Sequence, residues 1–149
     1  MIYLLDVNVL LAASYTSHYL HERADGWLKS VTEADTCARL ATCSVTELGF
    51  VRIACGGANL ARGVSFAQRD LIHLKAQKPF IFLDDSLDAN LLPPWVERSK
   101  QVTDGHLLQL ATTYSGTLVT LDEGIPGALL IPKDSLFVKE SGTQYGVAA

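Results

Sequence analysis

Ile2-Tyr3-Leu4-Leu5-Asp6 stands near the start of the sequence: four apolar residues followed at once by an acid. A short apolar run is typical of a buried strand, and the segment after it can continue as a helix. Strand-like and helix-like segments alternate along the rest of the chain, which predicts an α/β sandwich with a largely parallel sheet. We expect strands at Ile2–Leu5, Leu40–Cys43, Phe80–Leu83, Thr117–Leu121 and, at one edge, Leu136–Lys139. Helices are expected at Val7–Ser14, His18–Val31, Ser44–Ile53, Ser65–Gln77 and Asp104–Tyr114.

Two helix starts carry a local capping signal. Ser65 and Gln68 stand in the register of a capping box, and Thr103 precedes Asp104 as an N-cap residue. The sequence therefore predicts that side chains at these positions close the free N–H groups of their helices.

The length of 149 residues indicates a single domain, with a core over about residues 2–140 and a flexible tail over about 141–149. The longest apolar tract near the start has five residues, Val9–Ala13, against the ~20 that a membrane-spanning helix needs. The residues after Met1 include neither the basic segment nor the cleavage site that a signal peptide would have, so we expect no signal peptide. Cys37, Cys43 and Cys55 are odd in number and lack C-x-x-C spacing, which favours reduced, partly buried thiols over a zinc site. We expect a cytoplasmic protein without a membrane partner.

The net charge of −4 argues against a simple electrostatic binder of nucleic acid. That argument changes if four of the acids gather at one point to hold a metal ion. The remaining 12 of the 16 acids would then balance the 12 basic residues, and the rest of the chain would be neutral. The acidic balance therefore does not exclude a nucleic-acid substrate.

Four acids fall where the predicted strands end. Asp6 and Asp122 follow strands directly, Glu47 lies in the first turn of a helix after a strand, and Asp104 begins a helix. In a parallel α/β fold, ligands bind beyond the carboxyl ends of the strands, so all four would share one rim. Like charges raise one another's pKa, and a divalent cation that prefers oxygen ligands, Mg²⁺ or Mn²⁺, is the natural counter-charge.

Each acid also has a purely structural interpretation. Glu47 completes a capping box with Ser44, Asp104 suits the helix dipole, and Asp6 and Asp122 can be turn formers. Each explanation is reasonable for one acid. It is much less convincing that four separate structural reasons would place four acids at the same edge of the sheet. By contrast, Asp84-Asp85, which also follows a strand, is interpreted as a solvated turn, and His106 as a surface or core histidine of its helix.

Four blocks of the sequence resemble the signature blocks of PIN-domain ribonucleases, and most closely VapC-type toxins of toxin–antitoxin pairs. The blocks are Tyr3-Leu-Leu-Asp6-Val-Asn8-Val-Leu-Leu11, Thr46-Glu47-Leu-Gly-Phe-Val-Arg52-Ile53, Val102-Thr-Asp104-Gly-His-Leu-Leu-Gln-Leu-Ala111 and Leu118-Val-Thr120-Leu-Asp122. They occur in the family's order over nearly the whole chain. The resemblance implies a PIN-like three-layer sandwich and an endoribonuclease that depends on Mg²⁺ or Mn²⁺. It also implies that the chain forms a homodimer, acts on RNA and binds a small antitoxin.

On this resemblance the catalytic acids are Asp6, Glu47, Asp104 and Asp122. Asp6 and Asp104 are expected as direct metal ligands, and Asp122 directly or through water. Glu47 would bind through water or position the nucleophile, while Asn8 and Thr120 would hydrogen-bond the ligands. A loosely basic middle third is expected to contact the RNA backbone; its members are Arg52, Arg62, Arg69, Lys75 and Lys78.

Three other functions are alternatives to this interpretation, and the sequence argues against each of them. A phosphatase-like phosphoryl-transfer domain also begins with a strand and Asp, but it would need a second Asp where this chain has Asn8. A receiver domain would need two acids after the first strand, and only one is present. A non-catalytic PIN-like module that binds RNA or protein would need a broken acid quartet, which is intact here.

Overall fold

The computed structural model describes residues 1–56 and 63–133. Within them a single sheet of five strands runs in the order β3-β2-β1-β4-β5, and every neighbouring pair is parallel. The strands are β1 (Ile2–Leu5), β2 (Arg39–Cys43), β3 (Phe80–Leu83), β4 (Thr117–Thr120) and β5 (Leu129–Leu130). Their carboxyl ends therefore lie at one edge of the sheet, as expected for a parallel α/β fold.

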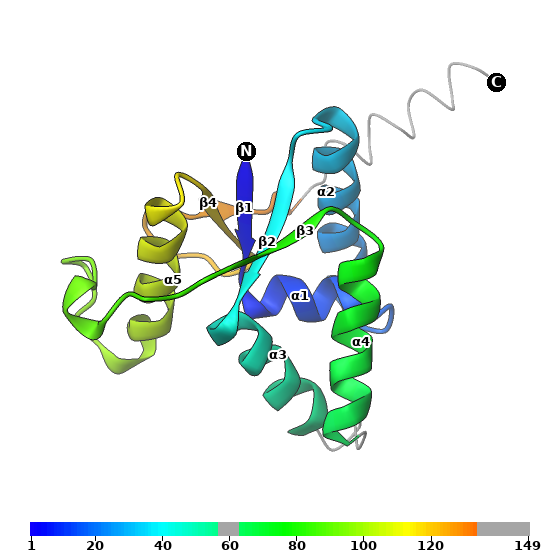
Figure 1. Ribbon diagram of the computed structural model, residues 1–149, viewed down its shortest axis with the longest axis horizontal. Helices are drawn as coiled ribbons and strands as arrows, with labels where there is room; N and C mark the ends of the chain where they lie inside the picture. The colour runs from blue at the N-terminus through cyan, green and yellow to red at the C-terminus, as the bar shows by residue number, and fades with distance from the viewer. Residues whose placement is uncertain (57–62, 134–149) are drawn as a thin grey trace.

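Helices cover both faces of the sheet, so the predicted three-layer α/β sandwich is confirmed (Figure 1). One face carries α1 (Val7–Ser14), α2 (His21–Ala34), α3 (Ser44–Gly56) and α4 (Val64–Ala76), and the other carries α5 (Val102–Thr113). Two 3-10 turns, η1 (Ala89–Leu91) and η2 (Ser99–Gln101), lie between β3 and α5.

The two halves of the core follow from the alternation of side chains along the strands. Leu5 faces the four-helix layer and packs with Leu10, Leu28 and Phe50. Leu4, its neighbour, faces the other way and packs with Leu107 of α5. β1 is buried on both faces because it lies in the middle of the sheet, and its near-continuous apolar sequence reflects this position.

A glycine brings α3 close to the end of β1. A Cβ on Gly49 would lie 2.8 Å from Cγ2 of Val7, the first residue of α1. The missing side chain therefore lets the first turns of α1 and α3 meet at the same edge of the sheet. The two acids nearest to this contact in sequence are Asp6 and Glu47.

Both predicted caps are wrong. α4 begins at Val64 with Gly63 as its N-cap and without a capping side chain, so Ser65 and Gln68 lie inside the helix. α5 begins at Val102, because the 3-10 turn of η2 leads directly into it, and Thr103 is a helical residue. α2 begins at His21 rather than His18, since residues before it form separate turns. The sequence near each helix could not predict where α2, α4 and α5 begin, because each start depends on the conformation of the segment that precedes the helix.

The edge strand of the sheet differs from the prediction. β5 is Leu129–Leu130, which pairs with Val119 and Thr120 of β4 and is too short to show a period in the sequence. The predicted strand at Leu136–Lys139 and the tail over 141–149 lie outside the described residues. Cys43 is buried and Cys55 half-buried as predicted, but Cys37 is exposed, since it lies in the turn before β2. No described helix has the length and apolar character needed to cross a membrane.

Candidate active site

Asp6 forms the centre of the acidic edge. It follows β1 directly and serves as the N-cap of α1, because its Oδ1 accepts a hydrogen bond from the Val7 N–H at 2.7 Å. Its side chain is buried, and its backbone N–H donates to the Val119 carbonyl of β4. Burial raises the pKa of Asp6, while the hydrogen bonds from Thr120 and Val7 oppose that rise and the charge of Asp122 adds to it.

Thr120 links the acids of β1 and β4. Its Oγ1 donates to Asp6 Oδ2 at 2.8 Å and accepts from the Asp122 N–H at 3.0 Å. Asn8 joins the same network, since its Nδ2 donates to Thr120 Oγ1 at 3.4 Å and its Oδ1 accepts from the Leu121 N–H at 3.2 Å. Side chains from both strand ends therefore hold the Asp6 carboxylate in one orientation.

Asp104 approaches the same group from α5. Its pKa is raised to about 6, first by burial and then by the negative charges of Asp6 and Asp122. The three carboxylates thus interact with one another, although 98 residues separate Asp6 from Asp104 in the sequence. Such mutual repulsion is the electrostatic signature of a functional carboxylate cluster.

Glu47 is held differently from the other three acids. Its Oε1 accepts a hydrogen bond from Thr42 Oγ1 at 2.6 Å, and Lys75 of α4 forms an ion pair with the same oxygen. The capping-box interpretation of Glu47 is wrong, because these two groups from β2 and α4 occupy its carboxylate. Lys75, expected to contact RNA, is instead paired with Glu47.

The donor set of the three aspartates fits a hard divalent cation. Mg²⁺ and Mn²⁺ take carboxylate oxygens, and a cation would relieve the repulsion that raises the pKa of Asp104. In the conformations that the described residues adopt, no group of three or more His, Cys, Asp or Glu side chains stands ready to hold a metal ion. The chemistry of the site therefore suits a metal, and closer convergence of the carboxylates would be required to bind it.

The other residues expected to contact RNA differ in their surroundings. Arg52 is exposed on α3, and Arg69 of α4 stacks over the Phe66 ring at 5.0 Å. Arg62 lies outside the described residues, and Lys78 is half-buried before β3. No hydrogen bond or ion pair joins the described side chains of this set to the three aspartates.

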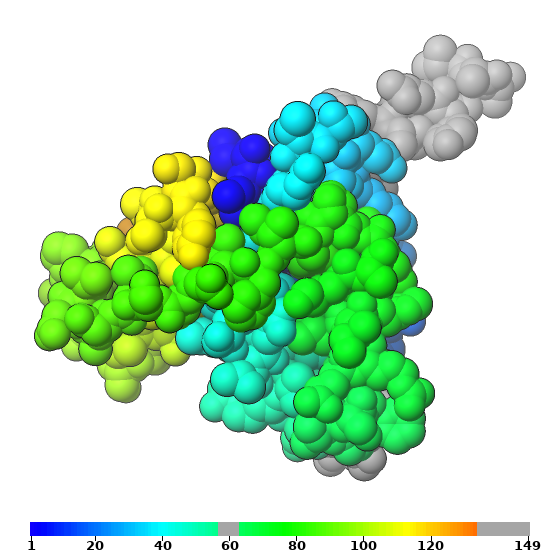
Figure 2. All heavy atoms as spheres, viewed as in Figure 1, coloured from blue at the N-terminus to red at the C-terminus, as the bar shows by residue number. Residues whose placement is uncertain are grey.

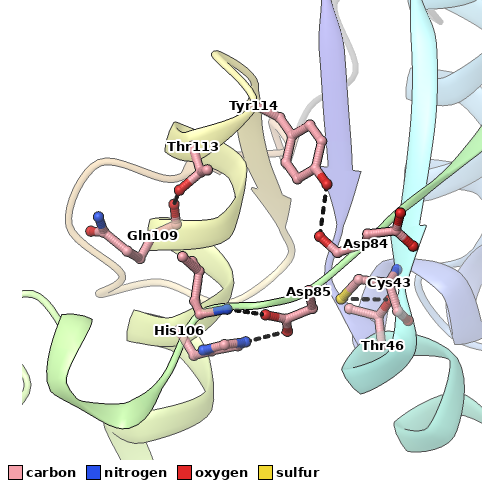
Figure 3. Close-up of polar contacts among 9 residues, drawn as sticks. Cys43, Thr46, Asp84, Asp85, His106, Gln109, Thr113 and Tyr114 are labelled. Carbon is pink, nitrogen blue, oxygen red and sulfur yellow. Dashed lines mark hydrogen bonds and ion pairs between the residues drawn. The ribbon is translucent and has the colours of Figure 1, made fainter.

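Besides the Glu47–Lys75 pair, the structure contains a pair between Asp85 and His106, which was not predicted from the sequence. Asp85 Oδ2 accepts a hydrogen bond from Nε2 of His106 on α5 at 2.5 Å, and the Asp85 side chain is only 10% exposed (Figure 3). The interpretation of Asp84-Asp85 as a solvated turn is therefore wrong for Asp85. Its position two residues after β3, like that of Asp6 after β1, is the signal that could have identified it.

Comparison with known proteins decides the family. Ribonuclease VapC38 of Mycobacterium tuberculosis is 39% identical to this chain over 127 residues, which cover 82% of this chain and 86% of the relative. The chain belongs to the VapC family of ribonucleases. Two further VapC ribonucleases of the same organism, VapC44 and VapC29, are 33% and 34% identical and cover 84% and 89% of this chain, and 92% and 98% of their own lengths.

Solved structures agree with this VapC fold. The chain matches a VapBC2 structure of Rickettsia felis, bound to a DNA fragment of its promoter, with a TM-score of 0.59, 15% identity and coverage of 87% of this chain and 97% of that one. It matches PAE2754 of Pyrobaculum aerophilum with a TM-score of 0.60, 24% identity and coverage of 95% and 90%. At these identities the matches establish the fold alone. No protein-family model matches the chain.

Proposed function

We propose that this VapC-family chain is the toxin of a toxin–antitoxin pair and hydrolyses RNA phosphodiesters with Mg²⁺ or Mn²⁺. The observation that carries the proposal is the mutual repulsion of Asp6, Asp104 and Asp122 at the carboxyl edge of a parallel sheet. A site with this charge is suited to a cation and, through it, to a phosphate. VapC ribonucleases of M. tuberculosis supply the substrate class.

Asp6, Asp104 and Asp122 would hold the metal ion. When bound, the ion would lower the pKa of a water and offset negative charge on the cleaved phosphodiester. Thr120 and the Val7 N–H fix both oxygens of Asp6, so this carboxylate is positioned before any ligand arrives. Asn8 holds the Thr120 side chain in place, because it donates to Thr120 Oγ1 and accepts from the Leu121 N–H just after β4.

Glu47 would bind the metal ion through water or position the attacking water. Thr42 and Lys75 hold its carboxylate through a hydrogen bond and an ion pair. Because Lys75 is paired with Glu47, its proposed role is to hold this carboxylate. Arg52, Arg62 and Arg69 would contact the RNA backbone without reading its sequence.

An antitoxin and a second copy of the chain are the proposed protein partners, and the cytoplasm is the proposed compartment. The fold shared with the R. felis VapBC2 complex supports a small antitoxin, and the free thiols of Cys37, Cys43 and Cys55 support a reducing compartment. The elements α3, α4 and β3 each carry exposed apolar side chains, which supports self-association; they are Leu48, Ile53, Val64, Phe66, Ile72 and Phe82.

The first prediction is metal-dependent cleavage that depends on the aspartates. Purified protein with Mn²⁺ or Mg²⁺ should cut RNA, and EDTA or the variant Asp104→Asn should reduce the rate by at least ~100-fold, because a metal ligand is lost. Asp25→Asn is the matched control, since it makes the same chemical change in an ion pair with Lys29 on α2. End-labelled RNA resolved on a gel measures the rate.

If Asp104→Asn and Asp25→Asn cut alike, the aspartate site is wrong. If no RNA is cut under any metal, the enzymatic proposal fails and the non-catalytic module becomes the better description.

A further inference from the structure

A pocket lies beside the acid cluster and takes no part in the chemistry proposed above. It has a volume of about 250 Å³ and sits between the first turns of α3 and α5 and the segment that contains η1. Its lining residues are Val45, Ala89, Leu92, Val102, Thr103 and His106. The volume is below the roughly 300–1,000 Å³ of sites for drug-sized ligands, so it suits a single small ring system.

Two residues that line the pocket lie within one helical turn of candidate acids. Val45 stands two residues before Glu47, and Thr103 is the chain neighbour of Asp104. The first turn of α5 therefore carries both a pocket residue, Thr103, and one of the candidate metal ligands, Asp104. In the space-filling view, the surface is indented where the segment after β3 faces α3 (Figure 2).

The far wall of the pocket is fixed to the rest of the fold. His106 holds Asp85, and Asp85 Oδ1 in turn accepts from the Leu87 N–H at 3.2 Å. Tyr114 Oη donates to the Asp84 carbonyl at 2.7 Å, as Figure 3 shows. These contacts anchor the start of the segment after β3 to α5, so the pocket exists before a ligand binds.

The residues that line the pocket indicate which kind of ligand it can bind. Four of the lining residues are apolar, Thr103 supplies a hydroxyl, and His106 supplies an imidazole whose orientation Asp85 fixes. Among the described residues, no lysine, arginine, aspartate or glutamate lines the pocket, and the imidazole of His106 is already paired with Asp85. A phosphate or an ionised side chain would therefore find no free counter-charge on these walls. A flat ring with a polar edge matches these walls, because bases stack on aromatic side chains and hydrogen-bond at their edges.

We propose that this pocket receives one nucleobase of the RNA next to the cleaved phosphodiester, and that it thereby selects the cleavage site. The proposal rests on the proposed function, since it takes RNA as the substrate. Thr103 and His106 are the polar groups that would distinguish one base from another.

Ala89→Trp tests the proposal, because Ala89 lines the pocket, is exposed on η1 and is not one of the acids. Wild type acting on RNA with randomised positions should prefer one base at one position beside the cut. The variant should lose that preference and show a KM for the preferred oligonucleotide raised about tenfold or more, with kcat within a few-fold. Ala34→Trp, an equal change at an exposed alanine that ends α2, should behave as wild type.

An abasic probe isolates the base itself. An oligonucleotide that lacks the base at the preferred position should be cut equally by wild type and Ala89→Trp. Val102→Trp fills the pocket from α5 and should reproduce the effect, which guards against a local misfold in either variant. If both variants keep the wild-type preference and KM, the proposal is overturned and the pocket serves another partner, such as an apolar side chain of an antitoxin.

A binding measurement separates this proposal from the proposed function. In an Asp122→Asn background, Ala89→Trp should weaken the binding of the labelled oligonucleotide about tenfold in fluorescence anisotropy. Weaker binding with no cleavage by wild type would overturn the proposed function and the role of the pocket in selecting a cleavage site, and would support base binding in the pocket alone. Equal binding would overturn the pocket proposal whatever the outcome for cleavage.

Discussion

Asp6 and Asp104 carry the same side chain in different surroundings. Asp6 is buried, but Thr120 and Val7 donate hydrogen bonds that favour its charged form. Across the described part of the chain, no hydrogen bond to the Asp104 carboxylate compensates for its burial or for the charges of Asp6 and Asp122. Among the acids that the structure describes, Asp104 is therefore the one whose ionisation costs the fold most and the one that a cation would stabilise most.

We predict that Asp104→Asn stabilises the metal-free protein in a pH-dependent way. The folded-state pKa of Asp104 is about 6 against an ordinary value of 3.8, so its ionisation costs nothing below about pH 4 and the full amount above about pH 6. The gain of the variant should grow through this window to about 1–2 kcal/mol, a figure discounted for the partial exposure of the carboxylate. Urea denaturation in EDTA at several pH values measures it.

Adding millimolar Mn²⁺ at neutral pH should then raise the melting temperature of wild type more than that of Asp104→Asn. Asp25→Asn is the control and should gain no stability above pH 6, since Asp25 is paired with Lys29. Parallel pH curves for wild type and Asp104→Asn would show that Asp104 is only a helix-start residue.

At the scale of elements, α5 depends on the connection that precedes it. The connection between β3 and α5 holds η1 and η2, and Val96 lies against Gly105 in the first turns of α5. A Cβ on Gly105 would come 2.3 Å from Val96 Cγ2 and 3.3 Å from Pro93 Cδ. The absence of a side chain at this position therefore lets the connection pack directly on the helix that carries Asp104 and His106.

We predict that Gly105→Ala destabilises the protein by about 1–3 kcal/mol, because overpacking forces the turn at Pro93–Val96 away from α5. Gly56→Ala is the matched control: it also lies in a helix, and a Cβ there would meet nothing within 4 Å. That control should be neutral or gain up to about 0.5–1 kcal/mol from helix propensity. Thermal or urea melts measure both, and equal stabilities would show that the turn yields without cost.

At the scale of the whole molecule, the four-helix layer leaves apolar side chains uncovered. On α3 and α4, Leu48 is 71% exposed and Ile72 is 68% exposed. Apolar side chains gathered in this way are typical of a surface that binds another protein. This layer is therefore the expected contact between two copies of the chain.

We predict that Ile72→Asp converts a dimer into a monomer without unfolding it, since a charge at an apolar interface loses its hydration. Light scattering coupled to size-exclusion chromatography measures the mass, and circular dichroism monitors the fold. Thr113→Asp places the same charge at an exposed position on α5, on the opposite face of the sheet, and should leave the dimer intact. A wild type that is monomeric at high concentration would contradict the prediction.

The order of strands and helices, and the positions of Asp6 and Asp122 at strand ends, could be predicted from the sequence. Apolar runs and helical periods are local properties, and an acid directly after a buried strand is visible without the fold. The parallel sheet then follows from the alternation, since short connections and crossover helices leave few other arrangements.

Only the tertiary structure decided which side chains pair. Lys75 reaches Glu47 across 28 residues, and His106 reaches Asp85 across 21, and no local pattern encodes either contact. The starts of α4 and α5 and the two-residue strand β5 also depend on neighbours distant in sequence. The physical reason is that burial and charge pairing act through space: the sequence determines which groups are available, and chain packing determines which of them meet.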